Sequence, residues 1–291
     1  MQVRGDRGFP DAVVPNLLLS ASDVVERLQV DPDNTRILDA RRLRDFRRGH
    51  IRSARHAWWQ DTMERNADTY GATLKPDDGT GEQTRRLAVL DLWGASLEMD
   101  VIVYGDRTSV EAARIVWFLS FLGFPRVALL DGGYAAWLGQ GIVRIDRPEG
   151  IGDPPASAAT APRNGYYLLY EQVLNRLAEG NTVLLDVRTA AELADTVDGT
   201  VRPGTIPGAI VWPWDTVLDG DGLIRPAAEL ADRARSLGLR RDQRVILVGR
   251  FATDCALSWL ALRLIGFADV PTYDGGWTEW ATEPGASVAW R

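Results

Sequence analysis

The stretch that decides the fold is "VILVGRFATDCALSWLALRLIGF", residues 245–267. An apolar run, a short polar loop and a longer apolar segment follow one another. This order is typical of a buried strand that leads through a loop into a helix. The same plan occurs earlier as "DVIVYGDRTSVEAARIVWFLSFLGF", residues 100–124. The chain therefore contains two copies of one strand–loop–helix unit.

The repetition extends to the blocks around these units. Asp39-Ala-Arg41 corresponds to Asp186-Val-Arg188, and Leu130-Asp-Gly-Gly133 corresponds to Tyr273-Asp-Gly-Gly276. The first and last aspartates of these blocks are 92 positions apart in the first copy and 88 in the second. Solenoid repeats span only about 20–50 residues, so this period indicates two copies of a whole domain.

Within each copy, predicted strands alternate with predicted helices. The strands of the first copy are short, continuous apolar runs at 36–38, 101–104 and 127–130. Helical segments such as 20–28 and 227–237 carry apolar residues every three or four positions. This alternation predicts an α/β fold in which each domain is a doubly wound, mostly parallel sheet with helices on both faces. Ligands bind such sheets beyond the carboxyl ends of strands, which here are the loops after Tyr104 and Val248.

The domain boundaries follow from composition. A stretch rich in Pro, Gly and Ala separates the two copies and shows no periodicity, so it reads as an extended linker. We predict a first domain at residues 17–145, a linker at 146–165 and a second domain at 166–291. At about 150 residues per domain, a chain of 291 residues has room for two such cores.

Charge and composition limit the partners. The net charge of -7 and the pI near 5.0 argue against a nucleic-acid partner, which normally needs a basic face. No apolar run is long enough to cross a bilayer and the N-terminal residues show no signal pattern, so we expect a cytoplasmic protein with no membrane partner. A single cysteine allows no internal disulfide, and two histidines are too few for a zinc site, so no metal is expected.

In order and in duplicate, these blocks resemble the tandem rhodaneses, the thiosulfate and 3-mercaptopyruvate sulfurtransferases. The likeness covers roughly residues 18–290 and includes "RPGTIPGAIVWPW" at 202–214 and "YDGGWTEWATEPGASVAW" at 273–290. It implies two rhodanese-like domains, a non-catalytic first one and a second one that carries the active loop. It implies no cofactor, and as partners a small sulfur-containing anion and a thiol or cyanide acceptor.

In this family, a nucleophilic cysteine follows the strand and starts a loop whose backbone N–H groups form a cradle. Such a cradle favours a thiolate and accommodates an anion. The thiolate attacks the outer sulfur of the donor, becomes a persulfide and passes that sulfur to cyanide or a thiol. The resemblance places this active, anion-binding loop at Val248, Gly249, Arg250, Phe251, Ala252, Thr253 and Asp254.

The chain departs from the family pattern at the nucleophile. The family's cysteine falls on Gly249 when counted from the strand and on Val248 when counted from the helix, and neither residue is a cysteine. An arginine that the family carries four positions after Arg188 is replaced by Glu192. The histidine of the second Gly-His-Ile turn is replaced by Thr205.

Part of the anion-binding set remains. Arg202 matches the arginine of the family's Pro-Arg-Pro-Gly block, although an ion pair with Asp186 or Glu192 is an alternative role for it. Arg188 keeps the Asp-x-Arg arginine, and Arg250 adds a cation in the loop. Arg250 and Phe251 could face a ligand, or they could be a solvated arginine and a packed aromatic ring.

Cys255 allows two interpretations. As a catalytic residue it would lie in the first helical turn, where unpaired N–H groups and the helix dipole lower a thiol pKa, helped by Arg250. As a core residue it would pack as a small hydrophobe in line with Ser258, Trp259 and Leu262. Because most free cysteines are buried and inert, the core interpretation is favoured.

For the other candidate residues, a structural role is the favoured interpretation. Asp254 is expected to cap the following helix, with Thr253 as the competing cap. His50 and His56 are expected to make structural hydrogen bonds. Six tryptophans are expected to fill the interfaces between layers and domains: Trp58, Trp59, Trp212, Trp214, Trp277 and Trp280.

Two functions remain open from sequence. The first is a sulfurtransferase of weak or no standard activity, which would have to use Cys255. The second is a catalytically silent rhodanese module that binds a small anion, a persulfide or a protein partner through the same pocket. The sequence also leaves open whether the first domain only supports the second or forms one wall of its pocket.

Overall fold

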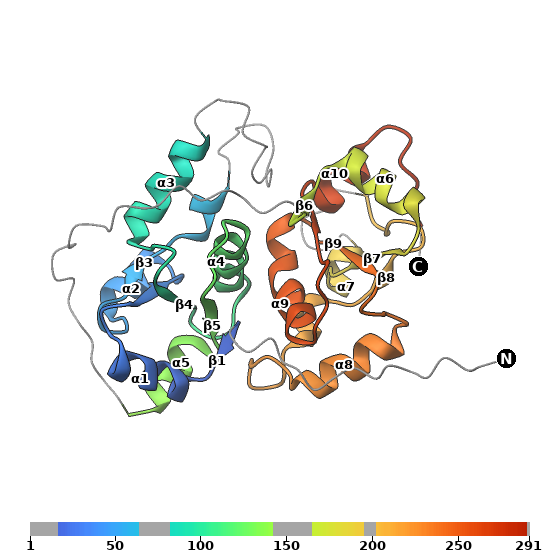
Figure 1. The fold of residues 1–291 in the computed structure, drawn as a ribbon. Helices are drawn as coiled ribbons and strands as arrows, with labels where there is room; N and C mark the ends of the chain where they lie inside the picture. The colour runs from blue at the N-terminus through green and yellow to red at the C-terminus, as the bar shows by residue number, and fades with distance from the viewer. Residues whose placement is uncertain (1–16, 64–81, 142–164, 195–201, 290–291) are drawn as a thin grey trace.

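The computed structural model describes residues 17–63, 82–141, 165–194 and 202–289 as two α/β lobes that lie side by side (Figure 1). The predicted linker, 146–165, lies outside the described residues except for Gly165. No helix in these four ranges is long and apolar enough to cross a membrane.

The first lobe is built on a five-stranded parallel sheet in the order β1-β5-β4-β2-β3. Its strands are β1 (Leu18–Leu19), β2 (Thr35–Asp39), β3 (Arg55–His56), β4 (Asp100–Tyr104) and β5 (Val127–Leu130). Its helices are α1 (Ala21–Val30), α2 (Leu43–Arg48), the 3-10 turn η1 (Trp59–Thr62), α3 (Glu82–Trp93), α4 (Val110–Phe121) and α5 (Gly133–Gly139).

The second lobe repeats this topology in the order β6-β10-β9-β7-β8, again parallel throughout. Its strands are β6 (Tyr167–Leu168), β7 (Thr182–Asp186), β8 (Ile210–Val211), β9 (Arg244–Val248) and β10 (Thr272–Tyr273). Its helices are α6 (Tyr170–Glu179), α7 (Ala190–Leu193), η2 (Trp214–Val217), α8 (Ala227–Ser236), η3 (Ala252–Cys255), α9 (Ala256–Leu264) and α10 (Gly276–Thr282). The predicted strands and helices, and the doubly wound architecture, are confirmed.

The alternation along the strands explains why helices cover both faces. In β4, Val101 and Val103 point into the cluster that includes α4, whereas Ile102 points into the cluster under α1 and α5. Successive side chains of a strand face opposite sides, so a continuous apolar run needs an apolar cover on each side.

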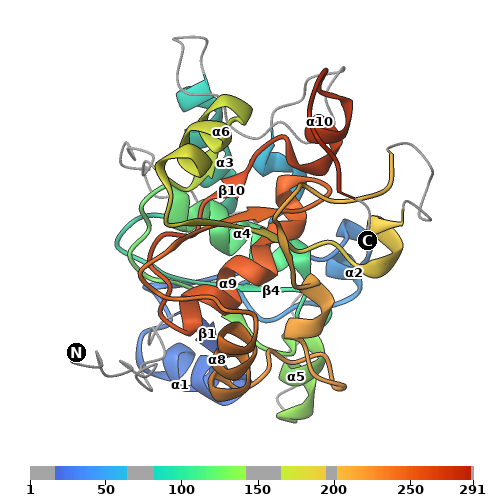
Figure 2. The ribbon, with the colours of Figure 1, turned by 90° about the vertical axis from the view of Figure 1, so that its right-hand side faces the viewer.

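Helices α4 and α9 lie against each other between the lobes (Figures 1 and 2). Buried residues of both helices belong to one continuous apolar cluster that crosses the interface, for example Trp117 and Leu260. Tyr166 bridges the two sides, with its ring 5.9 Å from Trp117 and 6.0 Å from Trp259. The shared core fixes the loops that precede α4 and α9 close to each other.

The histidines have the structural roles expected of them. His50 Nδ1 lies 3.0 Å from the carbonyl oxygen of Phe46, and His56 Nε2 lies 2.8 Å from that of Arg41. Trp212, Trp277 and Trp280 are buried in the core as predicted.

Candidate functional site

Backbone hydrogen bonds from the start of α10 fix the loop that follows β9. The backbone N–H of Trp277 donates to the carbonyl of Gly249 at 2.8 Å, and that of Thr278 donates to Arg250 at 3.3 Å. Gly276 has a φ of 55°, and a Cβ there would lie 2.7 Å from the Arg250 carbonyl oxygen. The Asp-Gly-Gly block therefore needs glycine because it approaches the loop backbone closely.

Neither position expected to hold the family's nucleophile opens toward solvent. Val248 is fully buried in β9 and packs in the apolar cluster with Trp277. A Cβ at Gly249 would lie 2.5 Å from the carbonyl oxygen of Phe251 and 3.2 Å from the sulfur of Cys255. The loop thus folds back over residue 249 and leaves no room there for a side chain.

Cys255 ends η3, directly before α9, and its side chain has no exposed surface. Burial raises the pKa of its thiol well above the ordinary value, and the charge of Asp254 raises it further. A hydrogen bond from the Gly249 backbone and the positive charge of Arg114 act in the opposite direction but do not offset burial. The thiol is therefore neutral and closed off in the core, the placement that the core interpretation expects.

Asp254 caps the short turn η3, while the predicted role was a cap of the following helix. Its Oδ2 accepts the backbone N–H of Phe251 at 3.1 Å. Burial and the nearby Glu192 raise the pKa of this carboxyl to about 6, although Arg250 lowers it. Thr253, the competing cap, is buried. A carboxylate with such a pKa at a cleft is a common mark of a functional position.

The arginines expected to bind an anion are engaged elsewhere. The fully buried Arg188 forms a bidentate ion pair with Asp186, with Nη2–Oδ2 at 2.6 Å, and its Nη2 also donates to the Gly204 carbonyl at 2.7 Å. Arg202 donates to the Ala286 carbonyl at 3.0 Å, and no ion pair of Arg202 is found among the described residues.

One interpretation of the sequence made Arg250 a solvated side chain. The structure contradicts it, because only 7% of Arg250 is exposed. Its guanidinium carbon lies 5.9 Å from the centre of the Phe251 ring. Ala252 is buried beside it in η3. Of the predicted loop residues, the structure brings Phe251, Thr253 and Asp254 to the surface of one cavity.

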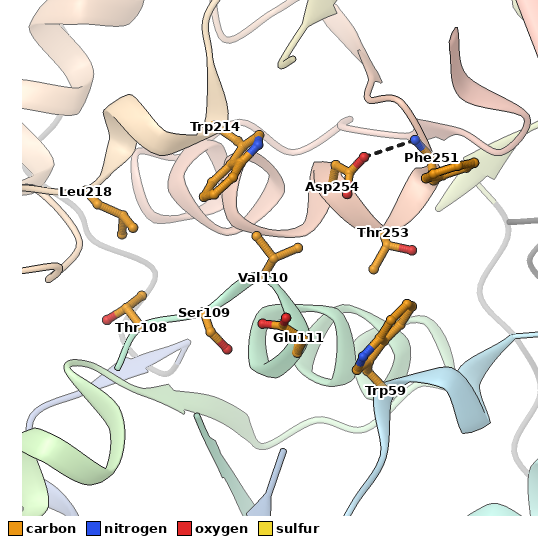
Figure 3. Close-up of a pocket in the computed structure, with 10 residues that line it drawn as sticks. All are labelled: Trp59, Thr108, Ser109, Val110, Glu111, Trp214, Leu218, Phe251, Thr253 and Asp254. Carbon is orange, nitrogen blue, oxygen red and sulfur yellow. Dashed lines mark hydrogen bonds between the residues drawn. The ribbon is translucent and has the colours of Figure 1, made fainter. Parts of the chain in front are cut away.

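That cavity, of about 480 Å³, lies between the two domains (Figure 3). Both domains line it, so the first domain does form one wall. The lining residues are Trp59, Thr108, Ser109, Val110 and Glu111 from the first domain, and Trp214, Leu218, Phe251, Thr253 and Asp254 from the second.

The place of two tryptophans in the cavity was not predicted from the sequence, which had left open whether the first domain forms a wall. Trp59 and Trp214 were expected to fill interfaces, but both are half-buried and line the cavity. Their equivalent positions in the two repeats were a sequence signal for this. Trp59 follows Ala54 by five positions and Trp214 follows Ala209 by five, and both alanines end a Gly-x-Ile block. Each tryptophan begins a 3-10 turn. Glu111 carried no comparable signal, because its place in the cavity depends on how α4 packs against the second domain.

Two pseudo-equivalent α/β domains with a cavity between their strand-end loops define a tandem-domain protein. The sequence model described as "Rhodanese-like domain" matches residues 20–140 and again 169–283. The chain belongs to this family, and the tandem resemblance noted from its sequence is confirmed.

Among curated relatives, the chain is 30% identical over 289 residues to "Sulfur carrier protein TtuD" of Thermus thermophilus, covering 94% of this chain and 97% of that one. It is also 30% identical over 253 residues to "Putative thiosulfate sulfurtransferase 1" of Mycobacterium bovis, covering 84% and 87%. Both names refer to sulfur carriage or sulfur transfer by these relatives.

Solved structures share the fold. The anaerobic ergothioneine biosynthesis enzyme from Chlorobium limicola, in complex with trimethyl histidine, superposes with a TM-score of 0.79 at 20% identity over 93% of this chain and 69% of that one. YnjE superposes with a TM-score of 0.75 at 21% identity, covering 94% and 68%. At these identities the likeness concerns the fold alone.

Proposed function

We propose that this rhodanese-family chain has little or no thiosulfate- or mercaptopyruvate-dependent sulfur transfer and acts as a binding module through its interdomain cavity. The observation that carries the proposal is the closed loop at Gly249, where a Cβ would lie 2.5 Å from the Phe251 carbonyl oxygen. A persulfide-forming cysteine needs both a side chain and an open path for the donor, and residue 249 has neither.

The state of Cys255 supports the same conclusion. A sulfur nucleophile reacts as its thiolate, and burial opposes that form here. Sulfur donors and acceptors would also have to reach an atom that has no exposed surface. Arg188 is fully buried, and neither Arg188 nor Arg202 lines the cavity, so there is less support for a small sulfur-containing anion as the ligand than the resemblance alone suggests.

The test measures turnover and thiol reactivity together. Thiosulfate:cyanide and mercaptopyruvate turnover are compared for wild type and Cys255→Ser, with cyanolysis to detect bound persulfide and iodoacetamide labelling before and after denaturation. We expect no turnover above background, no persulfide, and labelling only after denaturation. Turnover in wild type that the serine variant loses would overturn the proposal.

Sulfur carriage by Cys255 is the second candidate, and one observation favours it. The Gly249 backbone hydrogen bond and the charge of Arg114 both favour the thiolate of Cys255. If η3 unfolded and exposed Cys255, this thiolate would lie near the carboxyl end of β9, where the family carries its active loop. A persulfide that survives in native protein and disappears in Cys255→Ser would support this role. A thiol or a protein would then be the partner, and the cytoplasm is the proposed location in either case.

A further inference from the structure

The interdomain cavity has an unusual lining for a family that handles small anions. Of its ten lining residues, Glu111 and Asp254 are acidic and none is Lys, Arg or His. Three more are aromatic: Trp59, Trp214 and Phe251. Such a surface repels a doubly charged anion and attracts a cation.

We infer that this cavity binds a small organic cation of the alkylammonium class, held between Trp59 and Trp214 and paired with the carboxylates of Glu111 and Asp254. This inference rests on the proposed function in one respect: ligand binding in the cavity, and not chemistry at Cys255, is taken as the function of the protein.

The two tryptophans supply aromatic surface to the cavity from both domains. Trp59 projects into the cavity from the first domain and Trp214 from the second (Figure 3). Both are half-buried, so each leaves part of its indole exposed to the cavity. An ammonium group over an indole face is attracted by the negative face of the ring, and aromatic cages are a general means of holding alkylated amines.

The carboxylates lie on opposite sides of the same space. Asp254 comes from η3 and Glu111 from the first turn of α4 (Figure 3). The carboxylate of Asp254 accepts the backbone N–H of Phe251 at Oδ2, and a backbone hydrogen bond from Arg250 also stabilises it. With a pKa of about 6, Asp254 is ionised at neutral pH but is still poorly compensated, which is the state that an incoming cation relieves.

The positive charges nearby do not occupy the cavity. Arg114, a residue of α4, is fully buried, and its guanidinium carbon lies 4.2 Å from the centre of the Trp117 ring. Arg250 is 7% exposed and does not line the cavity. Its charge lowers the pKa of Asp254 and so helps to keep that carboxylate ionised for a ligand.

The test is isothermal titration calorimetry, in which each ligand is titrated into the full chain at pH 7.5. Choline is compared with its neutral isostere 3,3-dimethylbutanol and with thiosulfate, all at constant ionic strength. We expect choline to bind in the millimolar range or better, about tenfold tighter than the neutral isostere. Thiosulfate should neither bind nor compete.

Variants locate the binding. Asp254→Asn, which can still accept the Phe251 N–H, and Glu111→Gln should each weaken choline binding about threefold or more, and Trp214→Leu about tenfold. Two matched controls lie outside the cavity and should leave the affinity unchanged: Glu171→Gln, an exposed acid of α6, and Trp58→Leu, the neighbour of Trp59. Circular dichroism of each variant verifies that it is folded.

Three results would overturn the inference: equal binding of choline and the neutral isostere, no loss of affinity in the cavity variants, or thiosulfate that binds and displaces choline. None of these depends on sulfur transfer. Turnover through Cys255 would overturn the proposed function while choline binding could persist, and absent choline binding with absent turnover would overturn the inference alone.

Discussion

The loop after β4 and the loop after β9 are held by the same backbone contacts. Tyr134 N–H donates to the Gly105 carbonyl at 2.8 Å, as Trp277 N–H does to Gly249 at 2.8 Å. In both loops a Cβ on the glycine would meet a carbonyl oxygen two residues on, at 2.9 Å in the first loop and 2.5 Å in the second. A loop backbone of this kind is therefore a property of the fold in this chain, and it does not by itself indicate catalysis.

The side chains distinguish the two loops. In the first, Asp106 lies 3.7 Å from Nη1 of Arg41, whereas the residue at the same step of the second loop is Arg250. Nη1 of Arg188, the counterpart of Arg41, has no hydrogen-bond partner among the described residues. Five positions after the glycine, the first loop has Val110 and the second has Asp254. The first loop therefore pairs its acidic residue with a buried arginine, whereas the second loop places Asp254 in the lining of the cavity.

The largest effect is expected from removing the buried arginines that both domains share. Arg188→Ala leaves Asp186 buried with only the Thr205 hydroxyl as a side-chain partner, and should lower the free energy of unfolding by about 3–5 kcal/mol. Arg41→Ala leaves Asp39 with the Tyr104 hydroxyl and should cost a similar amount. Urea denaturation measures both. If Arg188→Ala lowered the free energy of unfolding by less than about 1 kcal/mol while Arg41→Ala lowered it by more, the Arg188–Asp186 pair would not be structurally equivalent to the Arg41–Asp39 pair.

Restoring the family's cysteine should fail. Gly249→Cys places a Cβ 2.5 Å from a backbone oxygen, so we expect a loss of about 1–3 kcal/mol in stability and no thiosulfate:cyanide turnover. Gly105→Cys is the matched control, because its Cβ would meet the flexible Ser109 hydroxyl at 2.6 Å and a backbone oxygen only at 2.9 Å. A turnover gain in Gly249→Cys would mean that the second loop opens more readily than its packing indicates.

The difference between Val110 and Asp254 gives a pH-dependent prediction. The folded-state pKa of Asp254, about 6, exceeds the ordinary 3.8, so its cost to stability is absent at low pH and develops as pH rises from about 4 to about 6. Asp254→Asn should remove that dependence and raise the unfolding free energy at pH 7 by up to about 3 kcal/mol. Thermal unfolding from pH 4 to 8 measures it. Parallel curves for wild type and variant would contradict the prediction.

Much of this molecule follows from local sequence patterns. Apolar runs and their spacing gave the strands, the helices and the duplicated domain, because burial on both faces of a parallel sheet leaves a direct mark on sequence. The burial of Cys255 was also accessible from its helical neighbours. The cavity was not, because Trp59, Glu111 and Asp254 meet only through the packing of α4 against α9, a contact between residues far apart in the chain.

The smallest effect concerns the cation that replaces Asp106 in the second loop. Arg250 lowers the pKa of Asp254, so Arg250→Ala should raise that pKa above about 6, by less than about one unit because burial remains the main cause. The readout is the pH midpoint of choline binding, which should move upward with the carboxylate it reports. Arg107→Ala, at an exposed residue of the first loop, is the control and should leave the midpoint in place. An unchanged midpoint in Arg250→Ala would mean that Asp254 does not govern binding, and the charge difference between the two loops would then have no bearing on the cavity.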